Sequence, residues 1–254
     1  LEYALEIVRA AAEAGADCLK TQTYTADSIT LDCDSEDFRI TSGLWKGRTL
    51  YELYSEAHTP FEWQPTIKRE CDRLGIDFLT SVFDFSSVDY LEGIKVEAYK
   101  IASPELVDIP LIKKAASTGK PMIISTGLGT LDEIRDAVEA CRSVGNDSIV
   151  LLKCTAEYPA KFEDMNLATI PDMSERFGVP IGLSDHSLGF AADVAAVALG
   201  ARVVEKHFCI TREHESVDSA FSMDKEEFAA MVKAVDEAAK AVGHVNYERS
   251  ELEE

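Results

Sequence analysis

The sequence predicts an α/β fold, a (β/α)8 TIM barrel whose first strand is missing from the chain. Short apolar segments typical of strands alternate with amphipathic segments typical of helices, and we count seven strands and eight helices, beginning with a helix. Strict alternation predicts a parallel sheet, and this number of units favours a barrel over an open sheet. The length of 254 residues, 46% of them hydrophobic, suits one domain of barrel size.

The first half of the chain is predicted to hold four strands. A helix over residues 2–14 ends at Gly15, and a strand over 17–22 follows. The polar segment 23–51 is too long for an ordinary connection, so we expect a functional loop there. The other elements expected in this half are a helix over 50–74 interrupted near Pro60, a strand over 76–81, a helix over 87–91, a strand over 98–102, a helix over 109–117 and a strand over 121–125.

The second half is predicted to continue the same alternation. Thr130 and Glu133 form a capping box that opens a helix to about Arg142. The final helix has Asp224 as its N-cap and ends at Gly243. Between these helices we expect a strand over 149–154, a helix over 166–177, a strand over 180–183, a helix over 190–199 and a strand over 202–206.

The two ends of the chain lead to further expectations. An open seam would expose two unpaired strand edges, so we expect an N-terminal strand to be absent from the barrel domain, residues 1–243. The acidic tail 244–254 has no apolar period and is expected to be a linker to an absent domain. We therefore expect residues 1–254 alone to be poorly stable and nearly inactive.

The charge and the cysteine content of the chain indicate which partners and which cellular compartment the protein is expected to have. The chain has 46 acidic and 25 basic residues, a net charge of −21, which argues against nucleic acid or an anionic membrane surface as a partner. No apolar run reaches the roughly 18 residues of a membrane span. The six cysteines contain no CxxC pair, which indicates free thiols in a reducing compartment. We expect a soluble cytoplasmic enzyme.

Polar side chains stand at the carboxyl ends of the predicted strands, where barrel enzymes carry their reactive groups. Lys20 and Lys100 lie in otherwise apolar runs, which is costly unless an anion or carboxylate meets them. With the hydroxyls of Ser103, Ser125 and Ser184 they would form a pocket for a phosphate or carboxylate. The alternative is that each lysine pairs with a neighbouring glutamate and each serine caps a helix.

Two histidines follow consecutive strands. His186 comes after the run 181–183 and His207 after the next strand. Neighbouring strands lie about 4.8 Å apart, so both imidazoles can reach one ion, with Asp185 and Glu205 as possible orienting groups. Either histidine alone could be structural. Two imidazoles with water and substrate oxygens suit Mn²⁺, Fe²⁺, Co²⁺ or Zn²⁺ as a Lewis acid. The residues thus predict a metal-assisted barrel enzyme acting on an anionic, phosphorylated small molecule.

Six ordered motifs resemble those of the sialic acid synthase family. They occupy residues 19–23, 99–105, 124–127, 154–159, 182–186 and 205–208, and the resemblance covers almost the whole chain. Members of this family condense phosphoenolpyruvate with an N-acylated amino sugar to give a nine-carbon nonulosonic acid. The resemblance therefore implies a phosphoenolpyruvate-dependent transferase that releases phosphate.

Within the family, residues 47–54, 57–60 and 245–248 are most similar to the pseudaminic acid synthases, whose sugar is 2,4-diacetamido-2,4,6-trideoxy-altrose. Neuraminate and legionaminate synthases are the alternatives. Ala156 stands where neuraminate synthases usually carry asparagine, which favours a different sugar.

The resemblance also implies roles for individual residues. Glu105 and Asp218 would be catalytic and face the sugar, Glu105 by stabilising positive charge at C2 or by positioning a water. His186 and His207 would hold the metal, Mn²⁺ first, with Mg²⁺ or Co²⁺ as alternatives. The substrate-binding residues would be Lys20, Gln22, Ser81, Lys100, Ser103, Ser125, Tyr158 and Ser184.

The sequence departs from the family in two places. The first strand with its Glu-x-Gly-x-Asn-His motif is absent, and so is the small C-terminal antifreeze-like domain that supplies an arginine across a swapped homodimer. Outside the family, two readings stay open. A metal-dependent barrel aldolase or hydrolase would need no phosphoenolpyruvate, and a truncated barrel could serve as a binding or regulatory subunit.

Overall fold

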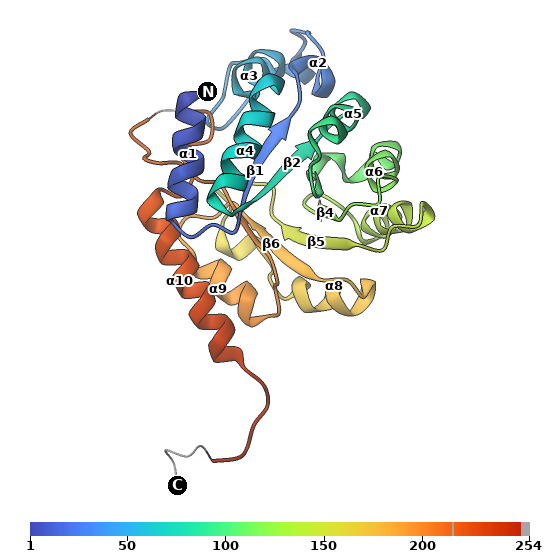
Figure 1. Cartoon of the computed structure of the whole chain (residues 1–254). Helices are drawn as coiled ribbons and strands as arrows, with labels where there is room; N and C mark the ends of the chain where they lie inside the picture. Colours follow the sequence, from blue (N-terminus) through green and yellow to red (C-terminus); the bar gives the residue numbers. More distant parts are fainter. Residues whose placement is uncertain (215, 250–254) are drawn as a thin grey trace.

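A single parallel sheet forms the centre of the molecule. The computed structural model describes residues 1–214 and 216–249, and within them seven strands pair in sequence order. Each strand lies next to the one before it, with helical segments in every connection, and the sheet curls around an interior (Figure 1). The strands are β1 (Cys18–Thr23), β2 (Asp77–Val82), β3 (Tyr99–Ile101), β4 (Met122–Ser125), β5 (Ile149–Cys154), β6 (Ile181–Asp185) and β7 (Val204–Lys206).

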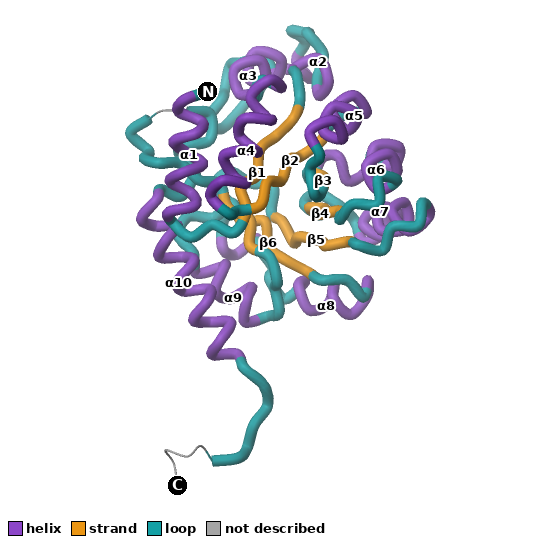
Figure 2. The backbone as a smooth tube through the Cα atoms, viewed as in Figure 1, coloured by secondary structure: helices purple, strands orange, loops and turns teal. Residues whose placement is uncertain are grey.

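Helices cover the outside of the curled sheet (Figure 2). Helix α1 packs against α4, and α10 against α9. The α-helices are α1 (Glu2–Glu13), α2 (Ala26–Ile29), α3 (Leu50–Ala57), α4 (Gln64–Leu74), α5 (Phe85–Ile94), α6 (Ile109–Ala116), α7 (Leu131–Ser143), α8 (Thr169–Phe177), α9 (Ala191–Ala198) and α10 (Lys225–Val242). Short 3-10 turns are η1 (Glu36–Phe38), η2 (Phe61–Trp63), η3 (Pro104–Val107) and η4 (Phe162–Asp164).

The barrel prediction is confirmed by this strand order. Within the described residues, β1 pairs with β2 alone and β7 with β6 alone. The further strand expected beside them stays a prediction, as does the linker over 244–254, of which residues 250–254 lie outside the described part of the chain.

Local sequence signals set the ends of several helices as predicted. The capping boxes at Thr130 and Asp224 are both formed, each with the glutamate three residues on. Gly15 follows α1 with a φ of 90°, which a glycine adopts without strain. A Cβ at that position would lie 3.2 Å from Val232 Cγ1, so glycine also lets the end of α1 approach α10 closely.

Two predicted helices have different starts. Helix α8 begins at Thr169 rather than residue 166, because Asn166 has a left-handed φ of 47° and its side-chain amide donates to the Asp164 carbonyl at 3.0 Å. Helix α5 begins before Ser87, because Asp84 caps it and accepts from the Ser87 N–H at 2.8 Å. In both cases a polar side chain bonding to nearby backbone decides where the helix starts.

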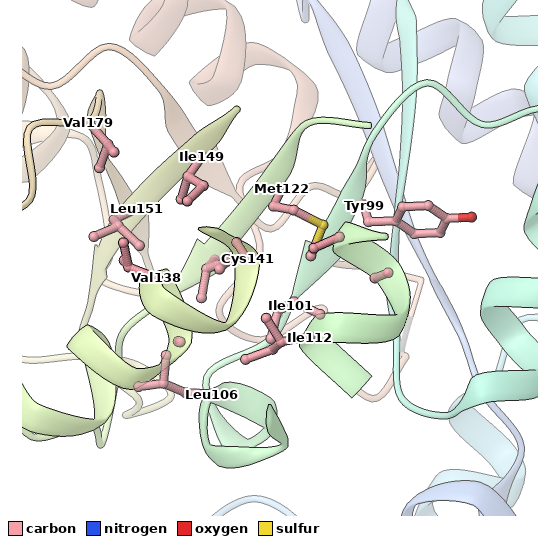
Figure 3. Close-up of a cluster of buried hydrophobic side chains, with 14 of the residues drawn as sticks. Tyr99, Ile101, Leu106, Ile112, Met122, Val138, Cys141, Ile149, Leu151 and Val179 are labelled. Carbon is pink, nitrogen blue, oxygen red and sulfur yellow. The ribbon is translucent and has the colours of Figure 1, made fainter. Parts of the chain in front are cut away.

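The hydrophobic core lies between the sheet and the helices, as the close-up in Figure 3 shows for β3 to β5. Tyr99 and Ile101 on β3 are fully buried in it, next to Met122 and Leu151 on the following strands. Because side chains alternate along a strand, Lys100 between Tyr99 and Ile101 points to the opposite face, into the barrel.

Candidate active site

Lys100 is buried at the barrel interior with a neighbouring hydroxyl as partner. Only 2% of its side chain is exposed. Its Nζ donates to Ser125 Oγ at 2.6 Å and to the Ile101 carbonyl at 3.2 Å. Burial lowers the pKa of Lys100 to about 8, and the nearby Glu205 carboxylate opposes that fall. The β3–β4 pairing therefore sets a cation beside a hydroxyl, as the anion-pocket prediction requires.

Glu205 on β7 stands at the centre of this polar group. Its Oε1 lies 3.0 Å from Lys20 Nζ and 3.8 Å from Lys100 Nζ, and it accepts from Ser184 Oγ at 3.3 Å. Burial alone would raise the pKa of Glu205, but the charges of Lys100 and Lys20 lower it to about 2. The alternative reading of the lysines, as partners of a neighbouring glutamate, is thus correct for the free protein. Two ammonium groups against one carboxylate still leave a positive charge for an anionic ligand.

Ser103 has a different environment from the other predicted anion ligands. Its Oγ accepts the Gly127 N–H at 3.1 Å. A Cβ on Gly127 would lie 2.8 Å from that Oγ, so the close approach requires glycine. Ser103 therefore ties the turn after β3 to the turn after β4.

The two predicted metal-ligating histidines lie together. The ring centroids of His186 and His207 are 5.3 Å apart. The His186 Nδ1 lies 3.0 Å from the Thr155 carbonyl, so its N–H donates there and Nε2 is left as a ligand. On the other ring, His207 Nδ1 lies 3.5 Å from Asp218 Oδ2. Tyr158 lies against the pair, 4.3 Å from His186 between ring centroids.

The orienting groups suggested from the sequence are wrong. Asp185 faces away from the interior and forms an ion pair with Lys206, while it accepts the Ser187 N–H at 2.7 Å. Glu205 faces inward but pairs with lysines. Strand alternation explains the first error, because Asp185 is one residue out of phase with His186. The Thr155 carbonyl that orients His186 has no side-chain signature, so sequence reasoning missed it.

The donor set fits a divalent ion held through imidazole nitrogen. Within residues 1–214 and 216–249, no group of three or more His, Cys, Asp or Glu side chains could enclose a metal. His186 and His207 would thus be the protein ligands, and the other coordination positions would take water or substrate oxygens. Such an open site suits a Lewis acid rather than a structural ion.

Three further predicted residues lie at the same ends of the strands. Glu105 on η3 has a buried Oε2 with no hydrogen-bond partner in the described chain, and burial raises the pKa of Glu105 to about 7. Ser81 on β2 is also buried, and its Oγ has no partner among the described residues. Ser81 is in register with Gln22 on β1 and with Lys100 on β3. Buried polar atoms without partners are uncommon in folded proteins, and at the ends of barrel strands a bound ligand is one group that could satisfy them.

The thiols take no part in disulfides. All six cysteines are free, as predicted. Cys154 lies with its Sγ 4.0 Å from His186 Nδ1.

The structure thus brings the predicted residues into two adjoining groups. One group, the candidate anion-binding group, surrounds Glu205, and the other, the candidate metal-binding group, consists of the two histidines and their neighbours. The two groups adjoin each other at the end of β7. Glu205 and His207 are separated by one residue there, and side chains at alternate positions of a strand point to the same face. This arrangement can hold a phosphorylated anion beside a Lewis acid. None of the described helices is long and apolar enough to cross a membrane.

Comparison with known proteins identifies a family. The NeuB family pattern matches residues 7–247. A pseudaminic acid synthase of Campylobacter jejuni is 49% identical over 243 residues, 96% of this chain and 71% of that protein. A pseudaminic acid synthase of Helicobacter pylori is 43% identical, over 96% of this chain and 72% of that protein. An N,N'-diacetyllegionaminic acid synthase of Legionella pneumophila is 35% identical, over 96% and 69%.

Solved structures of other proteins superpose on most of this chain and so have the same fold. The N-acetylneuraminic acid synthetase of Leptospira borgpetersenii, crystallised with citrate, superposes with a TM-score of 0.87 at 30% identity, over 99% of this chain and 83% of that one. A truncated 3-deoxy-D-arabino-heptulosonate 7-phosphate synthase of Thermotoga maritima gives 0.74 at 18% identity, over 95% and 83%, which shows a shared fold alone.

Proposed function

Because this chain belongs to the NeuB family, we propose that it is a pseudaminic acid synthase. It condenses phosphoenolpyruvate with 2,4-diacetamido-2,4,6-trideoxy-altrose and releases phosphate. The observation that carries the proposal is the continuity of the two groups on β7, where the lysine-bound Glu205 and the metal-binding His207 share one face. Relatives named pseudaminic acid synthases, at 43% and 49% identity, support the choice of sugar.

Phosphoenolpyruvate carries a phosphate and a carboxylate, and the anion-binding group offers donors to both. Lys20 and Lys100 supply positive charge. Ser125 supplies a hydroxyl that is hydrogen-bonded to Lys100, and Ser184 supplies one that is hydrogen-bonded to Glu205. Ser103 and Ser81 complete the proposed contacts from neighbouring strand ends. The Glu205 carboxylate offsets part of the positive charge of the two lysines. Phosphoenolpyruvate, which carries three negative charges, is therefore bound less tightly than it would be by the lysines alone.

The amino sugar binds on the histidine side. His186 and His207 would hold a divalent ion, Mn²⁺ first and Mg²⁺ or Co²⁺ next, which would supply Lewis-acid chemistry toward the carbonyl of the open-chain sugar. Asp218 holds the His207 ring through Nδ1 and borders the sugar. Tyr158, against His186, and Gln22 on β1 complete the sugar contacts.

The bonding changes follow from holding the two substrates in contact. C3 of phosphoenolpyruvate adds to the aldehyde carbon as the C2–C3 double bond becomes single, and positive charge develops at C2. The aldehyde oxygen becomes a hydroxyl, and the water that adds to C2 supplies that proton and the one that leaves with phosphate. The carboxylate of Glu105 stabilises that charge or positions the water that adds to C2. The C2–O bond then breaks and phosphate leaves with the bridging oxygen. The raised pKa of Glu105, about 7, lets this carboxyl exchange a proton near neutral pH.

Within the family, neuraminate and legionaminate synthases are the alternatives. The test is to measure kcat/KM of the full-length protein with the altrose derivative, N-acetylmannosamine and the 2,4-diacetamido mannose analogue at saturating phosphoenolpyruvate. The altrose derivative is expected to give the highest value. A higher value with either of the others reassigns the sugar. We also propose a homodimer, which light scattering of the same preparation tests.

A further inference from the structure

Trp45 reaches the candidate active site from a distant part of the chain. It lies in the connection between β1 and α3, where the Ile40 N–H donates to the Arg48 carbonyl at 2.9 Å and the Gly47 N–H to the Ile40 carbonyl at 2.8 Å. These bonds close a hairpin-like loop with Trp45 near its tip. The Trp45 indole N–H donates to the Val217 carbonyl at 3.1 Å, which fastens the loop to the segment that carries Asp218.

Three aromatic side chains form what we call the aromatic wall: Trp45, Tyr158 and Phe221. The Trp45 ring centroid lies 6.4 Å from that of Tyr158 and 6.4 Å from that of Phe221. Phe221 in turn lies 5.1 Å from Tyr158 and 5.0 Å from His207. The wall therefore stands directly beside the histidines.

The members of the wall differ in exposure. Phe221 is 2% exposed and serves as packing, whereas Tyr158 is 41% exposed and Trp45 is partly exposed. Tyr158 contacts His186 directly, and Trp45 extends the accessible apolar surface outward from Tyr158. A partly open apolar surface next to the histidines is placed to contact the substrate that the histidine side would hold, which under the proposed function is the amino sugar.

We propose that Trp45 is a specificity-determining residue that contacts the methyl group of an N-acyl substituent on the amino sugar. The inference rests on the proposed function and adds a substrate contact to it. An indole face excludes water from a methyl group and has no hydrogen-bonding group there to satisfy. One methyl group in an apolar pocket changes the specificity constant by about 10-fold to 200-fold. Trp45 therefore favours acetylated over formylated or free amino sugars.

The test compares wild type with Trp45→Ala and Trp45→Phe on N-acetyl and N-formyl forms of the same sugar. Wild type is expected to prefer the acetyl form in kcat/KM by at least about tenfold. Trp45→Ala is expected to raise KM for the acetyl sugar about tenfold, to lose the preference, and to leave KM for phosphoenolpyruvate within about twofold. Trp45→Phe keeps an aromatic face, loses the bond to Val217, and is expected to keep most of the preference.

A matched control is Phe162→Ala, which removes a 56% exposed aromatic ring on η4 that lies outside the wall. It should change neither KM. Equal kcat/KM of wild type for the two sugars would overturn the inference, whether or not a variant folds. An equal loss in Trp45→Phe and Trp45→Ala would do so as well, since loop placement would then be the cause. Absence of condensation by wild type with every sugar would instead refute the proposed function.

Discussion

The Nζ of Lys20 lies 3.0 Å from Oε1 of Glu205, so an ion pair joins β1 to β7 across the barrel interior. These are the two strands that pair with a single neighbour in the described chain. Lys100 lies 3.8 Å from the same oxygen. Glu205 therefore acts as an internal counter-ion that an anionic substrate must share or displace.

Glu205→Gln removes that counter-ion. Breaking a buried pair costs roughly 3–5 kcal/mol, and because the Lys20 and Glu205 side chains are 21% and 17% exposed, we expect a loss of about 1–3 kcal/mol. Added inorganic phosphate should raise the melting temperature of the variant more than that of wild type, because the lysines then lack a partner. Thermal denaturation with and without phosphate measures both effects. Phosphate raising the melting temperature of wild type and Glu205→Gln by the same amount would contradict this role. Glu163→Gln, at an exposed position, is the control.

Lys206 supports the histidines from the opposite face of β7. Its buried ammonium pairs with Asp185 and donates to the Ser187 and Gly189 carbonyls at 2.8 Å, which holds the turn after His186. Lys206→Met leaves the buried Asp185 carboxylate without its counter-ion, although its hydrogen bonds from Ser187 remain, and should cost about 3–5 kcal/mol of unfolding free energy.

Urea denaturation tests the Lys206 prediction. Adding Asp185→Asn to Lys206→Met should recover part of the loss, because the uncompensated carboxylate is gone. The exposed Lys113→Met should stay within about 0.5 kcal/mol of wild type. A loss below about 1 kcal/mol in Lys206→Met would show that the buried pair is not needed.

Glu105 gives stability a dependence on pH. Burial raises its pKa from 4.5 to about 7, so the folded protein holds the proton more tightly than the unfolded chain. The stability that the protonated carboxyl contributes is fully present below about pH 4.5 and is lost as pH rises through about 7. Glu105→Gln should therefore raise the melting temperature relative to wild type at pH 8, and far less at pH 5. Glu157→Gln, at an exposed position, should give no such difference, and a pH-independent effect of Glu105→Gln would refute the assignment.

His207→Ala tests the metal site. Loss of a residue that only supports a metal ligand lowers metal affinity by about 10-fold to 100-fold. Loss of one of the two imidazole ligands should therefore lower Mn²⁺ affinity by at least about 100-fold, while the fold is retained. Metal content after dialysis, with circular dichroism as the check on folding, measures this. His58→Ala is the matched control, since His58 bonds to the Ser55 carbonyl in α3, away from the site. Unchanged metal content in His207→Ala would remove His207 from the site.

Sequence patterns predicted the elements and the grouping of most candidate site residues because both depend on local features. Strand ends in a barrel meet at one rim, so Lys20, Lys100 and His207 could be grouped without coordinates. The errors arise where contacts are distant or involve backbone. Trp45 meets Val217 across 172 positions of sequence, which no local period signals. Asp185 points away from the interior because successive side chains of a strand point to opposite faces, so a shift of one residue reverses the predicted direction.

The most direct test of the central claim is the coupling of phosphate release to the sugar. The full-length protein is purified and incubated with Mn²⁺ and phosphoenolpyruvate, with or without the altrose derivative, and phosphate and nonulosonic acid are quantified together. We predict equal amounts of phosphate and acid when the sugar is present, and no phosphate above background when it is absent. Phosphate released at the same rate without sugar, or sugar consumed without phosphate release, would contradict a phosphoenolpyruvate-dependent synthase.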